Sequence, residues 1–242
     1  MFTLMKRTLW IGLPITMAIL AIGFYQAMYV APVDVNQGNI YRIIFYHVPS
    51  NVMGLLFPYV NFVASIVYLL TRRSNPLRAQ AADALAVASA EVTLVFCTIG
   101  LATGMLWAKP VWGIWWTWDE RLTSFLVLWL IYVSYLLLRR FTAGGQTQTL
   151  AAVLSVFAAV DVPIVYMSIR WWRTQHPSPV FFGGPGAGLD PRMMPAFYLN
   201  LAGWFCWGVL LVALRYQLER KRQKKEQASS LAALEANMET AR

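Results

Sequence analysis

The chain of 242 residues has only two histidines, His47 and His176, and each lies among aromatic and arginine residues. His47 ends the run YRIIFYH, which also holds Arg42, and His176 ends the run RWWRTQH. Between them, residues 111–123 read VWGIWWTWDERLT and contain four of the eleven tryptophans of the chain. Two imidazoles near so much flat aromatic surface indicate a site for a planar ligand that contains a metal.

Two histidines alone make a poor zinc or copper site, because no third histidine or nearby cysteine completes the usual set of ligands. They do match the two axial positions of a haem iron, whose other four ligands come from the porphyrin. Because the chain has no C-x-x-C-H motif, we expect haem b that is non-covalent and exchangeable, with its iron bound by His47 and His176. Cys97 and Cys206 lie in separate apolar blocks, and no disulfide is predicted.

Haem also needs aromatic surface for its macrocycle and cations for its two propionates, which guanidinium groups match well. If the tryptophan-rich segment is helical, Trp112, Trp115, Trp116 and Asp119 share one face while Trp118 points elsewhere. An aromatic belt at the membrane surface is the alternative for any single tryptophan, but it fits four in close succession less well. No catalytic residue is predicted. The predicted haem-binding residues are His47, His176, Trp112, Trp115, Trp116, Trp118, Asp119, Arg42 and Arg121, with the two arginines chosen for the propionates.

The elements that must position these residues are predicted to be transmembrane helices. Hydrophobic residues make up 58% of the chain and charged residues 13%, whereas soluble domains carry about 25% charged residues. The apolar residues form blocks of the length that crosses a bilayer, where only helices or closed barrels satisfy the backbone. We therefore expect an all-α polytopic membrane protein, a bundle of six transmembrane helices over residues 9–30, 48–71, 84–107, 122–139, 149–169 and 195–214.

The distribution of Lys and Arg predicts that both termini are cytoplasmic, because this orientation places fourteen of them inside and six outside. The two histidines, 129 residues apart, and the tryptophan-rich segment then share the outer face. We expect a six-span domain over residues 1–214, with the tryptophan-rich segment at 108–123, and a basic cytoplasmic tail over 215–242. The net charge of +9 is scattered between the spans and in the tail, which argues against nucleic acid as a partner.

Two other functions compete with haem delivery. A membrane redox subunit with bis-histidine haem b typically holds its histidines within the spans, whereas His47 and His176 flank them. An ion- or proton-coupled transporter would use Glu91 and Asp161, the carboxylates expected inside the third and fifth spans, where no Lys or Arg is deep enough to pair with either. That function leaves the outer tryptophans and histidines unexplained. The run GGPGAG at 183–188 predicts a flexible loop segment.

The pattern W-G-x-W-W-x-W-D-x-R-L-T, read from Trp112 to Thr123, resembles the WWD signature of haem-handling membrane proteins. The runs YRIIFYHVP (41–49) and RWWRTQH (170–176) resemble the histidine-bearing outer segments of the haem exporter protein C family, which acts in bacterial and plant-mitochondrial cytochrome c maturation. The length and the six spans agree with this family, so the resemblance covers nearly the whole chain.

The resemblance implies haem bound at the periplasmic face of the bacterial inner membrane, with His47 and His176 as axial ligands and the WWD segment against the haem. It further implies presentation of the haem to a periplasmic haem chaperone, to which haem becomes covalently attached. The implied partners are haem, that chaperone, the subunits of an ABC transporter, a small one-span subunit and membrane lipid. The chain would be a haem-delivery subunit and no classical enzyme, and whether it catalyses the attachment is left open.

Overall fold

The computed structural model describes residues 2–141, 146–182 and 188–240, so most of the predicted loop segment 183–188 lies outside the described residues. The predicted all-α fold with six spans is confirmed, because the described residues contain six helices long and apolar enough to cross a membrane. A short π-helix, η1 (Gln26–Val30), continues the first helix, and two 3₁₀ turns, η2 (Asn39–Ile43) and η3 (Pro191–Met193), precede the second and the last. The six helices are α1 (Phe2–Tyr25), α2 (Ile44–Thr71), α3 (Pro76–Trp112), α4 (Glu120–Phe141), α5 (Thr147–Trp171) and α6 (Met194–Thr240).

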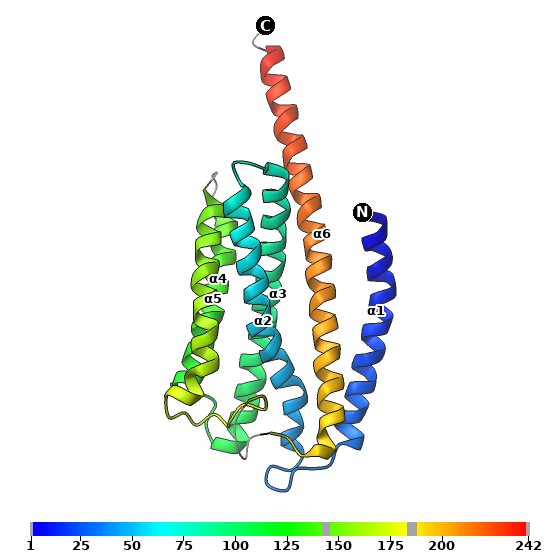
Figure 1. Cartoon of the computed structure of the whole chain (residues 1–242), viewed down its shortest axis with the longest axis vertical. Helices are drawn as coiled ribbons and strands as arrows, with labels where there is room; N and C mark the ends of the chain where they lie inside the picture. Colours follow the sequence, from blue (N-terminus) through cyan, green and yellow to red (C-terminus); the bar gives the residue numbers. More distant parts are fainter. Residues whose placement is uncertain (1, 142–145, 183–187, 241–242) are drawn as a thin grey trace.

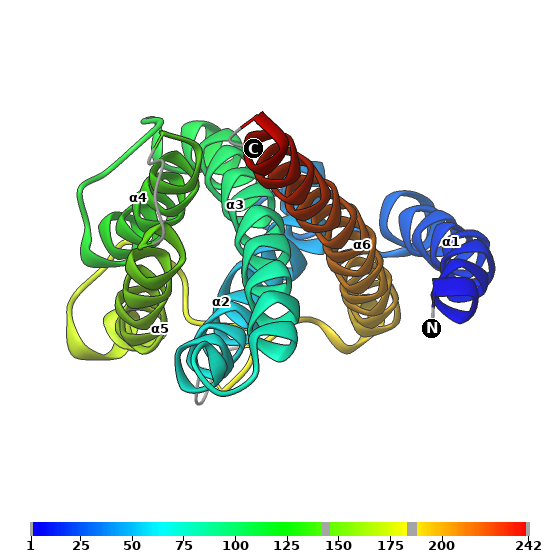
Figure 2. The ribbon, with the colours of Figure 1, turned by 90° about the horizontal axis from the view of Figure 1, so that it is seen from above.

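The helices α2 and α3 form the centre of the bundle, with α4 and α5 on one side and α6 on the other (Figure 2). The helix α1 lies at the outer edge and packs mainly against α6. Both termini lie toward one end of the bundle, which we call the tail end, and α6 continues beyond the other helices there (Figure 1). We call the opposite end, which carries residues 31–43, 113–119, 172–182 and 188–190, the site end.

Small side chains allow α3 to occupy the centre. Its buried alanines recur at every second position, which in a helix turns them toward all sides, so α3 is enclosed by its neighbours. Small residues let helix backbones approach closely in a membrane. The amide of Asn61 on α2 accordingly reaches the backbone of α3 and donates to the carbonyl oxygen of Ala86 at 2.8 Å. The alanines concerned are Ala82, Ala84, Ala86, Ala88 and Ala90.

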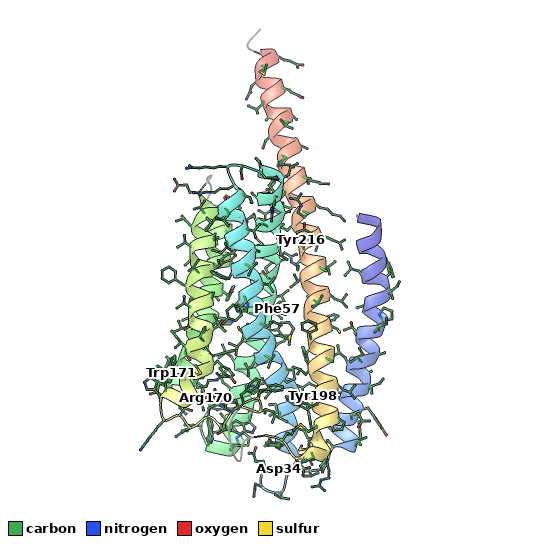
Figure 3. The ribbon with its side chains drawn as sticks, in the orientation of Figure 1. Asp34, Phe57, Arg170, Trp171, Tyr198 and Tyr216 are labelled. Atoms are coloured by element: carbon green, nitrogen blue, oxygen red, sulfur yellow. The ribbon has the colours of Figure 1, made fainter. Side chains whose placement is uncertain are left out.

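The helix α6 is fixed to this centre by aromatic packing at mid-bundle. Phe57 of α2 and Phe96 of α3 stack with ring centroids 5.9 Å apart. Gly208 of α6 faces them, and a Cβ at Gly208 would lie only 2.5 Å from the Phe57 ring. Figure 3 places Phe57 about halfway along the bundle. A glycine at this position therefore lets α6 pack closely against α2 and α3.

The prediction that no Lys or Arg lies deep enough to pair with Glu91 or Asp161 is wrong for Glu91. Arg215 of α6 binds both carboxylate oxygens of Glu91, with Nη2 and Oε1 2.6 Å apart. The expected third and sixth spans were too short, because α3 begins at Pro76 and α6 continues past residue 214 without a break. Arg215 therefore lies in α6, at the same height in the bundle as Glu91. Asp161 of α5 keeps one buried carboxylate oxygen, Oδ2, with no hydrogen-bond partner in the part of the chain that the structure describes.

Candidate functional site

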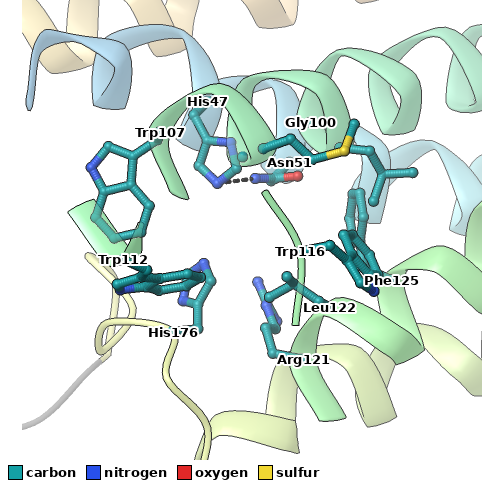
Figure 4. Close-up of a pocket in the computed structure, with 13 residues that line it drawn as sticks. His47, Asn51, Gly100, Trp107, Trp112, Trp116, Arg121, Leu122, Phe125 and His176 are labelled. Atoms are coloured by element: carbon teal, nitrogen blue, oxygen red, sulfur yellow. Dashed lines mark hydrogen bonds between the residues drawn. The ribbon is translucent and has the colours of Figure 1, made fainter. Parts of the chain in front are cut away.

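The site end brings together the segments that the span count predicted on one face. The loop before α2, which holds Asp34, and the end of α5, with Arg170 and Trp171, lie at this same end of the bundle (Figure 3). His47 lies in the first turn of α2, and His176 lies in the loop that follows α5. Their ring centroids are 6.4 Å apart and the ring planes meet at 31°. Figure 4 shows the two imidazoles facing one another across a gap.

Both ring nitrogens of His47 have hydrogen-bond partners. Nε2 lies 2.9 Å from the amide nitrogen of Asn51, and Nδ1 lies 2.9 Å from the hydroxyl oxygen of Thr103. An amide nitrogen only donates, so Nε2 accepts through its lone pair and the ring proton is on Nδ1. The hydroxyl oxygen of Thr103 accepts the hydrogen bond from Nδ1–H, and the Thr103 hydroxyl donates to the carbonyl oxygen of Ile99 at 2.7 Å. These bonds fix the orientation and the tautomer of His47.

Two glycines of α3 make room for His47 and Asn51. Gly100 and Gly104 are four residues apart and so lie on one face of α3, as His47 and Asn51 do on α2. A Cβ at Gly104 would lie 3.1 Å from Cε1 of His47, and a Cβ at Gly100 would overlap the amide of Asn51. The two glycines therefore let the imidazole and the amide lie directly against the backbone of α3.

His176 has a different arrangement, with one nitrogen engaged and one free. Its Nδ1 lies 2.8 Å from the carbonyl oxygen of Pro177. A carbonyl only accepts, so Nδ1 carries the proton and the lone pair of Nε2 is available. Burial, and then the positive charge of Arg121, lower the pKa of His176 to about 4. The ring is therefore neutral near pH 7, which is the form that binds a metal.

Two cavities meet at the histidine pair. Both are open to solvent: the first, of about 490 Å³, lies between α2, α3 and α4, and the second, of about 1480 Å³, lies toward the loops. Tyr41 and Tyr166 line the second cavity. Five residues line both cavities and so stand between them: His47, Asn51, Trp107, Arg121 and His176. The first is otherwise walled mainly by Gly100, Gly104, Trp112, Trp116, Leu122 and Phe125 (Figure 4).

The tryptophan-rich segment does not form the helix that would place four of these residues on one face. The helix α3 ends at Trp112 because Gly113 adopts a left-handed conformation, with φ +78°, that caps it. The next helix starts only at Glu120, and the chain between is irregular. Trp112 and Trp116 line the first cavity, whereas Trp115 and Trp118 line neither cavity and are 54% and 77% exposed. Trp112 and Trp116 therefore form an inner pair, and Trp115 and Trp118 form an outer pair.

Asp119 determines where α4 begins. Its Oδ1 accepts a hydrogen bond from the backbone N–H of Leu122 at 2.8 Å, which is the bond of a helix N-cap. Arg121 thereby lies in the first turn of α4 and lines both cavities. Its guanidinium donates to the carbonyl oxygen of Val165 on α5. Asp119 itself lines neither cavity, and its Oδ2 is buried with no hydrogen-bond partner among the described residues.

Arg42, the second residue predicted to bind propionate, lines neither cavity. Its guanidinium donates to the backbone carbonyl oxygens of Ala27 and Ala31, the latter at 3.0 Å, and its Nε donates to the Asn39 side chain. Arg42 therefore ties the end of η1 to the turn before α2. Its role in binding a propionate stays a prediction.

The arrangement fits haem better than a metal ion held by protein ligands alone. Among the described residues, no group of three His, Cys, Asp or Glu side chains could hold a metal ion. Two imidazoles that bind one metal at about 2 Å each have ring centres separated by about 6 Å, close to the distance between His47 and His176. Aromatic walls on one side and Arg121 between the cavities match the flat macrocycle and the acidic edge of haem.

Comparison with known proteins agrees with this fit. The family model of CcmC, heme exporter protein C, matches residues 1–230. The chain belongs to the haem exporter protein C family. It is 36% identical to heme exporter protein C of Bradyrhizobium diazoefficiens over 88% of this chain and 79% of that protein. It is 32% identical to heme exporter protein C of Escherichia coli K12, over 88% of this chain and 81% of that protein. It is also 32% identical to a putative cytochrome c biosynthesis ccmC-like mitochondrial protein of Marchantia polymorpha, over 84% of this chain and 87% of that protein.

Sequence reasoning missed three residues of the site in this member of the haem exporter protein C family. Asn51 and Thr103 bond the two nitrogens of His47, and Trp107 lines both cavities and donates to Gln37 at 2.8 Å. Two signals were present in the sequence. Asn51 follows His47 by four residues, the spacing of helix neighbours, and Gly100 and Gly104 form the G-x-x-x-G pattern of close helix packing.

Proposed function

We propose that this chain binds haem non-covalently between His47 and His176 and presents it to a periplasmic haem chaperone for cytochrome c maturation. One observation carries the proposal: the only two histidines of the chain face one another, 6.4 Å apart between ring centroids, where two cavities meet. Membership of a family named for haem export supports it. The haem is cargo that must leave again, so the bond of each imidazole to the iron must be reversible.

The residues around the pair divide the remaining work. Trp112, Trp116 and Trp107 offer aromatic faces to the macrocycle, and the cavities on both sides of the pair offer it space. Arg121 supplies positive charge beside both cavities, and a guanidinium binds carboxylates such as the propionates strongly. When bound, the iron supplies the electron-pair acceptor for the two imidazoles. The protein supplies the neutral rings, the aromatic walls and the charge.

Presentation to a soluble partner calls for exposed groups next to the site, and the outer tryptophans have that position. Trp115 and Trp118 are largely exposed, on the segment whose Trp112 and Trp116 line the cavity. Exposed tryptophan is typical of the residues that dominate protein contacts. Together with the excess of Lys and Arg on the tail side of the spans, this supports a site at the periplasmic face of the inner membrane. Subunits of an ABC transporter, a small one-span subunit and lipid would surround the spans.

The absorption spectrum of purified protein loaded with haemin tests the ligand assignment. We expect a low-spin bis-histidine spectrum in the wild type, a changed spectrum in His47→Ala and in His176→Ala, and its complete loss in the double variant. Trp10→Ala, an exposed change on α1 outside both cavities, is the matched control and should leave the spectrum unchanged. A bis-histidine spectrum that survives the double change would refute the assignment.

The division of the tryptophans tests presentation separately from binding. We expect Trp118→Ala, alone or with Trp115→Ala, to leave the haemin dissociation constant unchanged and to lower the yield of haem transferred to the chaperone severalfold. Trp112→Ala should instead weaken haemin binding, because Trp112 lines the cavity. Transfer is measured as haem that stays attached to the chaperone after denaturation. If the Trp115→Ala, Trp118→Ala double variant transfers haem as the wild type does, the two tryptophans serve only as membrane anchors.

A further inference from the structure

The two histidines differ in one respect that the proposed function does not explain. Nε2 of His176 has no hydrogen-bond partner among the described residues, so its lone pair is ready for iron. Nε2 of His47 has its lone pair occupied by the amide of Asn51 at 2.9 Å. Nδ1 of His47 is held by Thr103, so the ring cannot offer its other nitrogen without losing that bond and its orientation. Iron can reach His47 through Nε2 only after Asn51 gives way.

We propose that Asn51 is an internal competitor of haem iron for His47, which lowers the affinity for haem and favours its release. The exchange is balanced: haem binding breaks the Nδ2–H···Nε2 hydrogen bond and forms an Fe–Nε2 bond, to which the Nε2 lone pair contributes both electrons. No proton or electron leaves the site. The inference rests on the proposed function, because it takes His47 as a ligand of the iron.

The position of Asn51 supports a built competitor. Its amide lies in the space that Gly100 leaves free, since a Cβ there would overlap its oxygen and lie 3.1 Å from its Cγ. Asn51 also lines both cavities, so its side chain has space to turn into when iron arrives. Its place one turn after His47 on the same helix keeps the amide close enough to return. Since only His47 is held in this way, iron binds His176 first and leaves His47 first.

Haemin titration of the purified full-length chain, followed by absorption, tests the competitor. We expect Asn51→Ala and Asn51→Leu to lower the dissociation constant about fivefold, the effect of one neutral hydrogen bond. Leucine has the same number and branching of side-chain heavy atoms as asparagine but no donor, so agreement between the two variants excludes an effect of cavity formation. Gly100→Ala should act in the same direction, because the added methyl group displaces the amide. Asn51→Asp should raise the dissociation constant, since a carboxylate accepts only from a protonated Nε2.

Asn61→Ala is the matched control, because Asn61 is also a buried asparagine of α2 that bonds α3, far from His47. It should leave the dissociation constant unchanged. A merely structural Asn51 would make every variant at this position bind haemin equally or more weakly, and that result would overturn the proposal. Absence of haemin binding by the wild type, or binding by the double histidine variant, would instead defeat the proposed function.

A second measurement needs no haem. Diethyl pyrocarbonate acylates the imidazole nitrogen that carries a free lone pair, and mass spectrometry reports the two histidines of the chain separately. In the wild type we expect His176 to react faster than His47. Asn51→Ala should speed the reaction of His47 severalfold and leave that of His176 unchanged. Equal rates for His47 in the two proteins would show that Asn51 does not occupy its lone pair.

Discussion

The arginines that join helices at the tail end and the arginines beside the histidine site are held by different partners. At the tail end, two arginines bind carboxylates of α3: Nη1 and Nη2 of Arg139 donate to Asp83, at 2.7 and 2.9 Å, and Arg215 binds Glu91. At the site end, the exposed Arg192 pairs with its neighbour Asp190, whereas three other arginines bind backbone carbonyls. Arg121 donates to Val165, Arg42 to Ala27 and Ala31, and Arg170 to Phe182.

The kind of partner decides whether the positive charge of an arginine is neutralised within the protein or can still act on a ligand. A carboxylate cancels the charge of the arginine that it binds, whereas a carbonyl oxygen orients the guanidinium and leaves its full positive charge. In a site of low dielectric constant such a charge attracts an anion strongly. The tail end therefore uses its ion pairs to hold α3, α4 and α6 together, and under the proposed function the charge of Arg121 would attract the propionates of haem.

The largest effect is expected from breaking the best-buried pair of the tail end. The side chains of Asp83 and Arg139 are only 8% and 14% exposed, so Asp83→Ala leaves a nearly buried guanidinium without its partner. We expect a loss of about 3 kcal/mol of unfolding free energy, measured by denaturation in detergent. The folded fraction should bind haemin as the wild type does. A weakened haemin affinity in that fraction would mean that the two ends are not separate.

Removal of an arginine at the site end should change haemin affinity more than it changes the free energy of unfolding. We expect Arg121→Ala to weaken haemin binding about tenfold or more, because a charge-assisted hydrogen bond to a propionate is lost. Haemin dimethyl ester has no propionate charge, and the wild type and the variant should bind it equally. Arg121→Lys keeps the charge without the forked geometry and should lie between them. An equal loss of affinity for the ester would assign Arg121 to packing.

The smallest effect is expected at the second pair of the tail end. Glu91 and Arg215 have side chains 28% and 40% exposed, so water or lipid head groups can replace the lost partner. We expect Glu91→Gln to cost less than about 1 kcal/mol of unfolding free energy and to leave haemin binding unchanged. Glu91→Ala and Arg215→Ala should each lower the unfolding free energy by less than Asp83→Ala does. A larger loss would place Glu91 among the buried charges.

The sequence was sufficient for the fold and for the pairing of the histidines. Blocks of twenty apolar residues have few ways to satisfy their backbone in a bilayer, so hydropathy predicts six helices. Counted from the N-terminus, one span precedes His47, three precede Trp112 and five precede His176. Each number is odd, so all three residues are predicted on the side opposite the N-terminus. Counting spans therefore brings two histidines 129 residues apart to one end, where the structure has them 6.4 Å apart.

The details that decide contacts could not be read from the sequence in the same way. The conditional helix over Trp112–Asp119 fails at Gly113, whose left-handed backbone belongs to a cap and is not a matter of hydropathy. Arg215 lies one residue beyond the expected last span, and only the continuation of α6 brings it to Glu91. Arg42 has the right charge and loop, yet its donors are taken by backbone carbonyls. Such partners depend on packing in three dimensions.

The irregular backbone of residues 113–119 also indicates how deep the site lies in the membrane. Peptide groups outside helices cannot face hydrocarbon, and the exposed Trp115 and Trp118 show that this segment faces outward. The segment therefore lies at the lipid–water boundary, where tryptophan is favoured. His47, in the first turn of α2, and the cavity beside Trp112 and Trp116 begin at this same level. A ligand with an apolar ring and an ionised edge is an amphiphile, and here it would lie with each part in the solvent that suits it.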